Sequence, residues 1–276
     1  MKKELGIAVL LAVLCAVVAA LNPKFLSAVN LGNMANLVGM FGVFSIGMGL
    51  VIITGGIDLS VGSTFALAGV LMSMMLREWN WPWPVAVAAT IALPMALGVV
   101  HGLLVTWARI QPFIVTLCGL LIYRGMARFI AGDTTKGFGN AEGFETLPKL
   151  VKGHAFGLPM PFVILVVVSV VMWIVLHRSV YGRYLFAVGR NEEAARYSGI
   201  RTRLVIASSY VVAGLLTGLS AIMLAFYTNS VTPSTHGSFY ELYGIAAAVL
   251  GGCSLRGGEG SILGIIIGAT LLRVIE

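Results

Sequence analysis

Charged side chains are scarce in this chain. Asp, Glu, Lys and Arg make up 11% of its 276 residues, whereas 58% are hydrophobic. A soluble domain of this length needs far more charge to cover its surface, so the composition excludes an ordinary soluble protein. The hydrophobic residues fall in repeated runs of about 18 to 25, the helix length that crosses a hydrocarbon core of roughly 30 Å. The sequence predicts an all-α fold, that of a polytopic helical membrane protein.

Groups that could perform chemistry are also few. The three cysteines, Cys15, Cys118 and Cys253, lie in or beside apolar runs without metal-ligand spacing, so we interpret them as small buried hydrophobic residues. The four histidines are scattered, and no carboxylate pair occurs within a predicted span. Residues 257–260 are glycine-rich but lack the Lys and Ser/Thr of a nucleotide-binding loop. The sequence therefore predicts neither an enzyme nor a metal or cofactor site in this chain.

Nine membrane spans are expected from the apolar runs. The third follows a polar break at residues 55–63, and the eighth ends near residue 253. Because the last run ends at Glu276 without a polar tail, we expect the natural protein to continue for one more span, ten in all. The other seven predicted spans are residues 6–21, 37–54, 85–108, 113–131, 159–176, 204–227 and 261–275.

The distribution of Lys and Arg predicts the orientation, because these residues accumulate in cytoplasmic loops. With the N-terminus in the cytoplasm, ten of the 18 Lys and Arg residues lie on the inner side and five on the outer side. This orientation accounts for the net charge of +7 without a nucleic-acid partner. It places residues 177–203 in the cytoplasm and residues 132–158 outside.

Residues 177–203, which we call the basic segment, contain six arginines and a predicted short helix over 191–200. This helix is predicted from four features: an N-cap, two acids in the first turn where the helix dipole stabilises them, two alanines expected on the surface, and a glycine that ends it. The residues, in this order, are Asn191, Glu192, Glu193, Ala194, Ala195 and Gly199. The alternative is an ordinary loop that obeys the positive-inside rule, although 27 residues exceed what a connection between two spans requires.

The polar break at residues 55–63 holds Asp58, Ser60 and Ser63 between two apolar runs. Non-helical backbone at membrane depth is tolerated where protein covers it or where it lines a wet cavity, and a buried acid needs a partner. The break is compatible with a polar kink on a solute path. From the residues alone, the favoured interpretation is a tight cytoplasmic turn in which Asp58 caps the third span.

Three motifs resemble those of a known family. Residues 193–199 match the E-A-A-x-x-x-G motif of the membrane subunits of ATP-binding-cassette (ABC) importers. Residues 55–63 resemble the G-G-I-D-L-S-V-G signature of the ribose/monosaccharide permease branch, and residues 241–258 resemble a later stretch of that branch. The family usually has Asp-Ala at the positions where this chain has Tyr243 and Gly244, so a role that the family's aspartate performs is in doubt for this chain.

The resemblance implies a single transmembrane permease domain over residues 1–276, the permease subunit of a monosaccharide ABC importer in the bacterial inner membrane. It implies a second permease subunit, identical or paralogous, two cytoplasmic ATPase subunits that bind ATP and Mg, and a periplasmic sugar-binding protein. The helix at 191–199 would couple the chain to the ATPase. Residues 132–158 and 228–240 are the candidate loops for docking the binding protein.

A solute path for a neutral sugar is expected to offer hydroxyl groups and aromatic faces rather than charges. The candidate lining residues are Phe41, Phe44, Ser45, Asp58, Ser60 and Ser63. Two other functions remain open. A stand-alone secondary transporter would need ionisable groups in mid-membrane, of which the spans offer few beyond Asp58, Arg124 and Arg128. A permease for branched-chain amino acids shares the broad fold.

Overall fold

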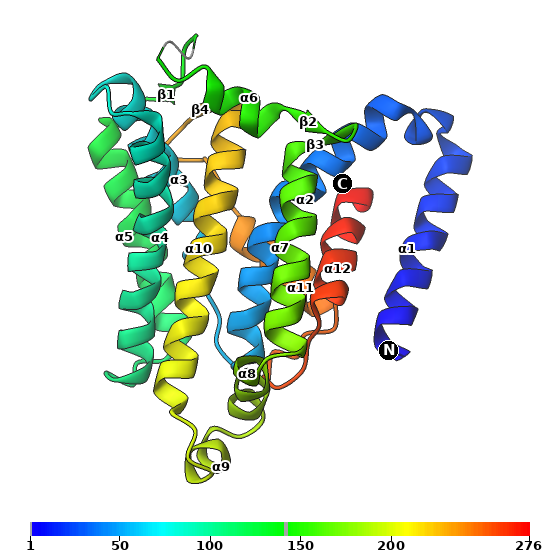
Figure 1. Cartoon of the computed structure of the whole chain (residues 1–276), viewed down its shortest axis with the longest axis vertical. Coiled ribbons are helices and arrows are strands. Elements are labelled where there is room, and N and C mark those ends of the chain that lie inside the picture. The colour runs from blue at the N-terminus through cyan, green and yellow to red at the C-terminus, as the bar shows by residue number, and fades with distance from the viewer. Residues whose placement is uncertain (1, 141–142) are drawn as a thin grey trace. The chain divides into compact units, whose positions relative to one another are not determined.

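The protein is helical, as the sequence predicts. The computed structural model describes residues 2–140 and 143–276, with side chains from Leu5 onward (Figure 1). Two parts of the predictions lie outside this description: residues 141–142 of the predicted external loop, and the side chains of Lys2 and Lys3, which were counted on the cytoplasmic side. The helices are α1 (Lys2–Leu21), η1 (Pro23–Leu26), α2 (Ala28–Ile53), α3 (Val61–Arg77), α4 (Trp83–Thr106), α5 (Pro112–Ala131), α6 (Thr146–Lys152), α7 (Met160–His177), α8 (Val180–Arg190), α9 (Glu192–Tyr197), α10 (Thr202–Thr228), α11 (Tyr240–Leu250) and α12 (Ile262–Ile275).

Two short antiparallel strand pairs complete the regular structure of the described residues. Strand β1 (Lys136–Gly137) pairs with β4 (Ser230–Val231). Strand β2 (His154–Ala155) pairs with β3 (Leu158–Pro159) to form a hairpin.

Five of the described helices are long and apolar enough to cross a membrane, namely α2, α4, α5, α7 and α10. Shorter apolar helices lie in α1, α3, α11 and α12, so each predicted span overlaps an apolar helix. The predicted eighth span is the main difference. Helix α11 has 11 residues and is therefore about 16 Å long, roughly half the thickness of a hydrocarbon core.

The chain divides into two compact units. Unit 1 comprises Met1–Gly55, His154–Ile200 and Tyr243–Glu276, and α2 lies at its centre between α7 and α12. Helix α2 is buried on all sides from Val38 to Ile53, which is why its sequence is apolar without a polar face. Gly39 allows close packing, because a Cβ there would overlap the backbone of Pro161 at the start of α7.

Unit 2 comprises Gly56–Gly153 and Arg201–Leu242, and its main contact joins α4 and α10. Glycines on both helices lie at this contact. A Cβ at Gly98 would overlap the backbone of Tyr210, and one at Gly214 would overlap the backbone of Pro94. The two helices approach closely because these glycines lack side chains.

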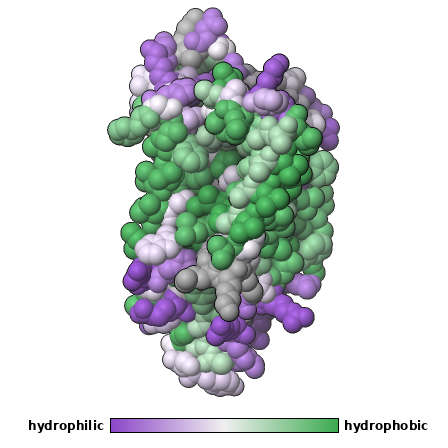
Figure 2. All heavy atoms as spheres, turned by 90° about the vertical axis from the view of Figure 1, so that its right-hand side faces the viewer, coloured by the Kyte–Doolittle hydropathy of each residue, from purple (hydrophilic) through white to green (hydrophobic). Residues whose placement is uncertain are grey.

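The outward surfaces of several helices are apolar. On α7, Val167, Val170 and Ile174 are exposed, and α1 exposes Val13 and Val17. Figure 2 shows one face of the molecule with a broad band of hydrophobic side chains and hydrophilic side chains gathered at its two ends. Such a band is the surface expected of a protein that meets lipid.

Candidate functional site

Helices α8 and α9 form most of the basic segment and lie beyond one end of α7 within unit 1 (Figure 1). Helix α9 has the predicted local structure. The Asn191 side chain accepts a hydrogen bond of 2.9 Å from the backbone N–H of Ala194, which makes it the N-cap. Glu192 and Glu193 occupy the first turn, and Gly199 ends the helix with φ of 84°. Helix α8 is additional, since the sequence analysis predicted only the second helix.

One feature of α9 differs from the prediction. Ala194 is exposed, as expected, but Ala195 is buried at 5% exposure, so the prediction that both alanines lie on the surface is wrong for Ala195. The reason is that α9 packs against α8, and adjacent helical positions point about 100° apart. The exposed surface of α9 instead includes Glu193 and Tyr197.

Helix α8 is joined tightly to the end of α2. A Cβ at Gly189 would overlap the carbonyl oxygen of Ile53, and that same oxygen accepts a hydrogen bond of 2.8 Å from the N–H of Gly258. The glycine-rich loop at 257–260 therefore serves close backbone packing between α2, α8 and the approach to α12. No flexible side chain separates α8 from α2 at this point, so the two helices are in direct backbone contact.

The polar break after α2 is organised by Asp58 in unit 2. Oδ1 of Asp58 accepts hydrogen bonds from the backbone N–H of Ser60 at 2.8 Å and from its hydroxyl at 2.7 Å. The Ser63 hydroxyl in turn donates to the carbonyl of Ser60 at 2.7 Å. Asp58 thus forms an Asx turn that leads into α3. It is not the cap considered in the sequence analysis, because the N-cap of α3 is Ser60, which makes no side-chain capping bond.

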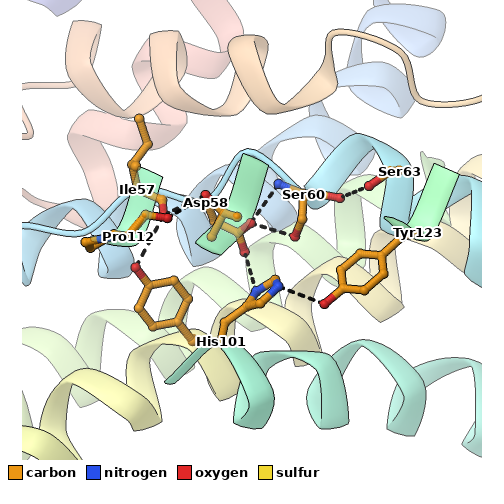
Figure 3. A network of polar contacts seen from close by, with 9 residues as sticks. Ile57, Asp58, Ser60, Ser63, His101, Pro112 and Tyr123 are labelled. Atoms are coloured by element: carbon orange, nitrogen blue, oxygen red, sulfur yellow. Dashed lines mark hydrogen bonds and ion pairs between the residues drawn. The ribbon is translucent and has the colours of Figure 1, made fainter. Parts of the chain in front are cut away.

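Asp58 also faces a histidine and a tyrosine that the sequence analysis did not connect with it. Its Oδ2 lies 4.0 Å from Nδ1 of His101 on α4, whose Nε2 is 2.8 Å from the hydroxyl of Tyr123 on α5. Figure 3 shows this chain of contacts running from the break through His101 to Tyr123. Tyr210 on α10 donates to the carbonyl of Ile57 at 3.3 Å. The buried Asp58 carboxyl, which lies in the break between α2 and α3, therefore has partners within the protein, as expected for an ionisable group between two apolar helices.

A small cavity lies beside this network within unit 2. It offers about 10 Å³ to a water molecule, close to the smallest volume that holds one. Its polar lining comes from Asp58, Ser60, Thr64, His101 and Tyr210. The arrangement can hold a water among several hydrogen-bonding groups. A group of three or more His, Cys, Asp or Glu side chains suited to a metal is absent from the described part of the chain.

The other predicted path residues, Phe41, Phe44 and Ser45, lie on α2 in unit 1. All three are buried, and the Ser45 hydroxyl donates to the carbonyl of Phe41 at 2.7 Å within the same helix. The two phenylalanine rings lie 5.5 Å apart. Asp58, Ser60 and Ser63 are brought together in unit 2 instead, so the six candidates form two separate groups.

The two loops predicted to dock a binding protein are paired in unit 2. Lys136 lies opposite Val231 in the β1–β4 pair, and the Thr135 and Thr232 hydroxyls are 3.0 Å apart. At the end of α5, the exposed Asp133 accepts two hydrogen bonds from Arg128, which hold the pKa of the Asp133 carboxyl below its ordinary value.

The arginines within α5 have different surroundings. Arg124 faces protein, because its Nη1 donates to the carbonyls of Pro233 and His236 at 3.1 and 2.7 Å. Its partners lie in the loop before α11, more than 100 residues away in the chain. Spacing alone could not reveal them. Arg273 on α12, which the sequence analysis did not consider as a site, is more deeply buried, with 7% of its side chain exposed.

Comparison with known proteins identifies the class. A helical fold with an apolar outer band, a buried polar break and a capped helix beyond the spans defines a multi-pass membrane protein. The family described as "Branched-chain amino acid transport system / permease component" matches residues 30–276, and the chain belongs to this family. No solved structure matches the chain.

Curated relatives are similar over nearly the whole chain. The ribose import permease protein RbsC of Bacillus subtilis (strain 168) is 38% identical over 275 residues, which are 99% of this chain and 84% of that protein. RbsC of Escherichia coli (strain K12) is 40% identical over 263 residues, 95% of this chain and 81% of that protein. The D-allose transport system permease protein AlsC of the same E. coli strain is 30% identical over 273 residues, which are 97% of this chain and 81% of that protein.

The predicted class is therefore confirmed. The chain is the permease subunit of an ABC importer, a multi-pass protein of the bacterial inner membrane, and it acts with ATPase and binding-protein partners. It is a transport subunit rather than an enzyme.

Proposed function

We propose that this chain forms the inner-membrane path for a monosaccharide, and that separate ATPase subunits which bind ATP and Mg drive the transport. The sugar assignment is supported by the printed functions of the relatives, which import ribose and D-allose. In this proposal residues 1–276 form one permease domain with nine spans and a cytoplasmic N-terminus. A second permease subunit, identical or paralogous, completes the path.

The single observation that carries the coupling mechanism is the capped helix α9 with Ala194 and Glu193 exposed at the end of unit 1. Residues 177–203 act as the coupling segment, and α9 enters a groove of the ATPase. Closure of the ATPase moves α9 and α8. The close packing of Gly189 on Ile53 then passes that movement to α2.

Residues 132–158 form the external loop that docks the binding protein, together with residues 228–240. The pairing of β1 with β4 supports this role, since it holds both loops in one surface of unit 2. Phe41, Phe44, Ser45, Asp58, Ser60 and Ser63 stay the proposed path residues, in two groups. Their side chains are buried in this state, so the path opens there through movement of the helices.

The test of coupling is Ala194→Trp in proteoliposomes that contain the permease, its ATPase and its binding protein. Because Ala194 is exposed, a large side chain there blocks the ATPase groove and leaves the chain folded. We expect binding-protein-stimulated ATP hydrolysis and sugar uptake to fall together by at least tenfold, with unchanged thermal stability. Normal coupling would refute the role of α9. Lys24→Met, at an exposed position outside the coupling segment, is the control.

The test of the solute uses the same proteoliposomes and a panel of radiolabelled D-ribose, D-allose, D-fructose and L-leucine. Each is supplied with the chain's own binding protein. The proposal predicts ATP-dependent uptake of at least one sugar and none of leucine. Leucine uptake without sugar uptake would favour the second candidate, the branched-chain amino-acid permease after which the family is described.

A further inference from the structure

Arg273 places a buried guanidinium at membrane depth in unit 1. It lies 11 residues after the start of α12, about 17 Å along the helix from the end that adjoins α8 and the loop at 257–260. In the proposed nine-span arrangement α12 starts at the cytoplasmic surface, so this distance is about half of a hydrocarbon core of roughly 30 Å. The Arg273 side chain is 7% exposed. An ionisable side chain at this depth is costly, and it is usually retained for a function.

Three helices build the surroundings of Arg273. Its Cζ lies 3.7 Å from the ring centroid of Phe41 on α2 and 5.0 Å from that of Tyr243 on α11. The two rings meet edge to face at 6.1 Å. Gly244 leaves room for the neighbouring Phe44 ring, because a Cβ there would come within 2.9 Å of that ring. These contacts position the plane of the guanidinium firmly.

The hydrogen-bonding capacity of Arg273 is only partly used. Nη1 forms an ion pair with Glu276, whose Oε1 also accepts a hydrogen bond of 3.2 Å from the Tyr243 hydroxyl. Nη2 is buried and has no hydrogen-bond partner among the described residues. A buried donor without an acceptor costs free energy, so this nitrogen favours any ligand that brings an oxygen to it.

The charge of the site indicates the chemistry of that ligand. Glu276 already balances the guanidinium, so the free Nη2 offers donors without a net positive charge. An anion gains little from such a site, whereas hydroxyl oxygens of a neutral polyol match it. Tyr243 is half-buried and Glu276 is exposed, so a solute reaches Nη2 when the Tyr243 ring turns aside.

We infer that Arg273, held by Phe41 and Tyr243, is a solute-binding site on the path that hydrogen-bonds the hydroxyl groups of an uncharged sugar. The inference rests on the proposed sugar function and adds a residue that determines the solute class. The site binds weakly and transiently, because a conduit must release what it receives.

The experiment measures D-ribose moved per ATP hydrolysed, with saturating binding protein, in proteoliposomes of the complete importer. If D-ribose is not carried, the sugar of the panel that is carried replaces it. Arg273→Met keeps an unbranched apolar stem in place of the first part of the side chain and removes its donors. We expect the sugar-to-ATP ratio to fall about tenfold while stimulated ATP hydrolysis is retained. Arg273→Lys keeps the positive charge beside Glu276 but loses the planar guanidinium and its paired donors, so it also lowers the sugar-to-ATP ratio several-fold.

The outcomes separate the possible roles of Arg273. An unchanged ratio in Arg273→Met would overturn the inference. Equal losses of uptake and ATP hydrolysis, or a complex that no longer assembles with Arg273→Met and Arg273→Lys alike, would also overturn it, since the residue would then be structural. Lys24→Met, which removes an exposed cation from the same unit, should keep the wild-type ratio. Failure of the wild-type importer to move any sugar of the panel would overturn the proposed function and this inference with it.

Discussion

Nε2 of His101 lies 2.8 Å from the hydroxyl oxygen of Tyr123, and both side chains are buried in unit 2. Tyr123→Phe keeps the ring that stacks on His101 and removes this hydrogen-bonding group. A buried histidine nitrogen then has no partner, so we expect a loss of about 1–3 kcal/mol in stability. Thermal unfolding of the purified protein measures it. Tyr227→Phe, at an exposed position, is the control, and an equal shift in both variants would refute the prediction.

A pair of substitutions at Asp58 separates its hydrogen bonds from its charge. Asp58→Asn keeps an oxygen that accepts the two hydrogen bonds from Ser60, whereas Asp58→Ala loses both. We expect Asp58→Ala to lower stability by about 1–3 kcal/mol, because two buried hydrogen bonds are lost, and Asp58→Asn to lower it much less. Thermal unfolding again provides the comparison. Equal destabilisation would mean that the charge facing His101, rather than the turn, dominates.

The contact between Gly189 and Ile53 predicts the effect of a single methyl group. Gly189→Ala places a Cβ on the carbonyl oxygen of Ile53, so α8 must shift away from α2. We expect about 1–3 kcal/mol of destabilisation, as for overpacking, and a several-fold loss of stimulated ATP hydrolysis. Gly125→Ala is the matched change, because nothing lies near its Cβ on the exposed side of α5. Full activity of Gly189→Ala would argue against transmission through this contact.

Two arginines one turn apart on α5 offer another matched comparison. Arg124→Met removes the donors to the carbonyls of Pro233 and His236, and we expect it to cost about 2 kcal/mol or more and to loosen that loop. Arg128→Met removes only an exposed pair with Asp133 and should have little effect. Thermal unfolding and limited proteolysis measure both changes. A larger effect at Arg128 would contradict the assignment of Arg124 as the anchor.

The pair of Arg128 and Asp133 also predicts a direction of pH dependence. Because Arg128 lowers the pKa of Asp133, its contribution is present above the ordinary carboxyl pKa and is lost as the pH falls through the lowered value. The small difference in stability between Arg128→Met and the wild-type protein near neutral pH should therefore disappear in strong acid. Thermal unfolding of both proteins across this pH range measures it, and a difference that grew as the pH fell would contradict the prediction.

Much of the candidate coupling site could be predicted, because caps are local. Asn191 bonds to a residue three positions later, and Gly199 ends the helix through its own φ, so the sequence contains the whole pattern. The burial of Ala195 could not be predicted in the same way. It depends on α8, whose packing against α9 is a tertiary contact.

The polar network shows the same division. The turn around Asp58 and Ser60 is encoded within three residues, whereas His101 and Tyr123 come from two other helices. The four histidines are scattered in the sequence, and the periodicity of a helix does not predict which neighbouring helix each of its faces will contact. Arg273 was overlooked for the same reason: its aromatic partners lie on α2 and α11.

The sequence by itself determined the membrane class, the positions of the apolar helices and the local caps, because hydrophobic length and hydrogen bonds to near neighbours act along the chain. Only the tertiary structure decided which polar groups meet at depth, which alanine of α9 stays exposed and which arginine nitrogen lacks an acceptor. These features depend on how helices that are distant in the sequence pack against one another. The hydrophobic pattern permits several packing arrangements, and close packing at residues such as Gly98 and Gly189 selects one of them.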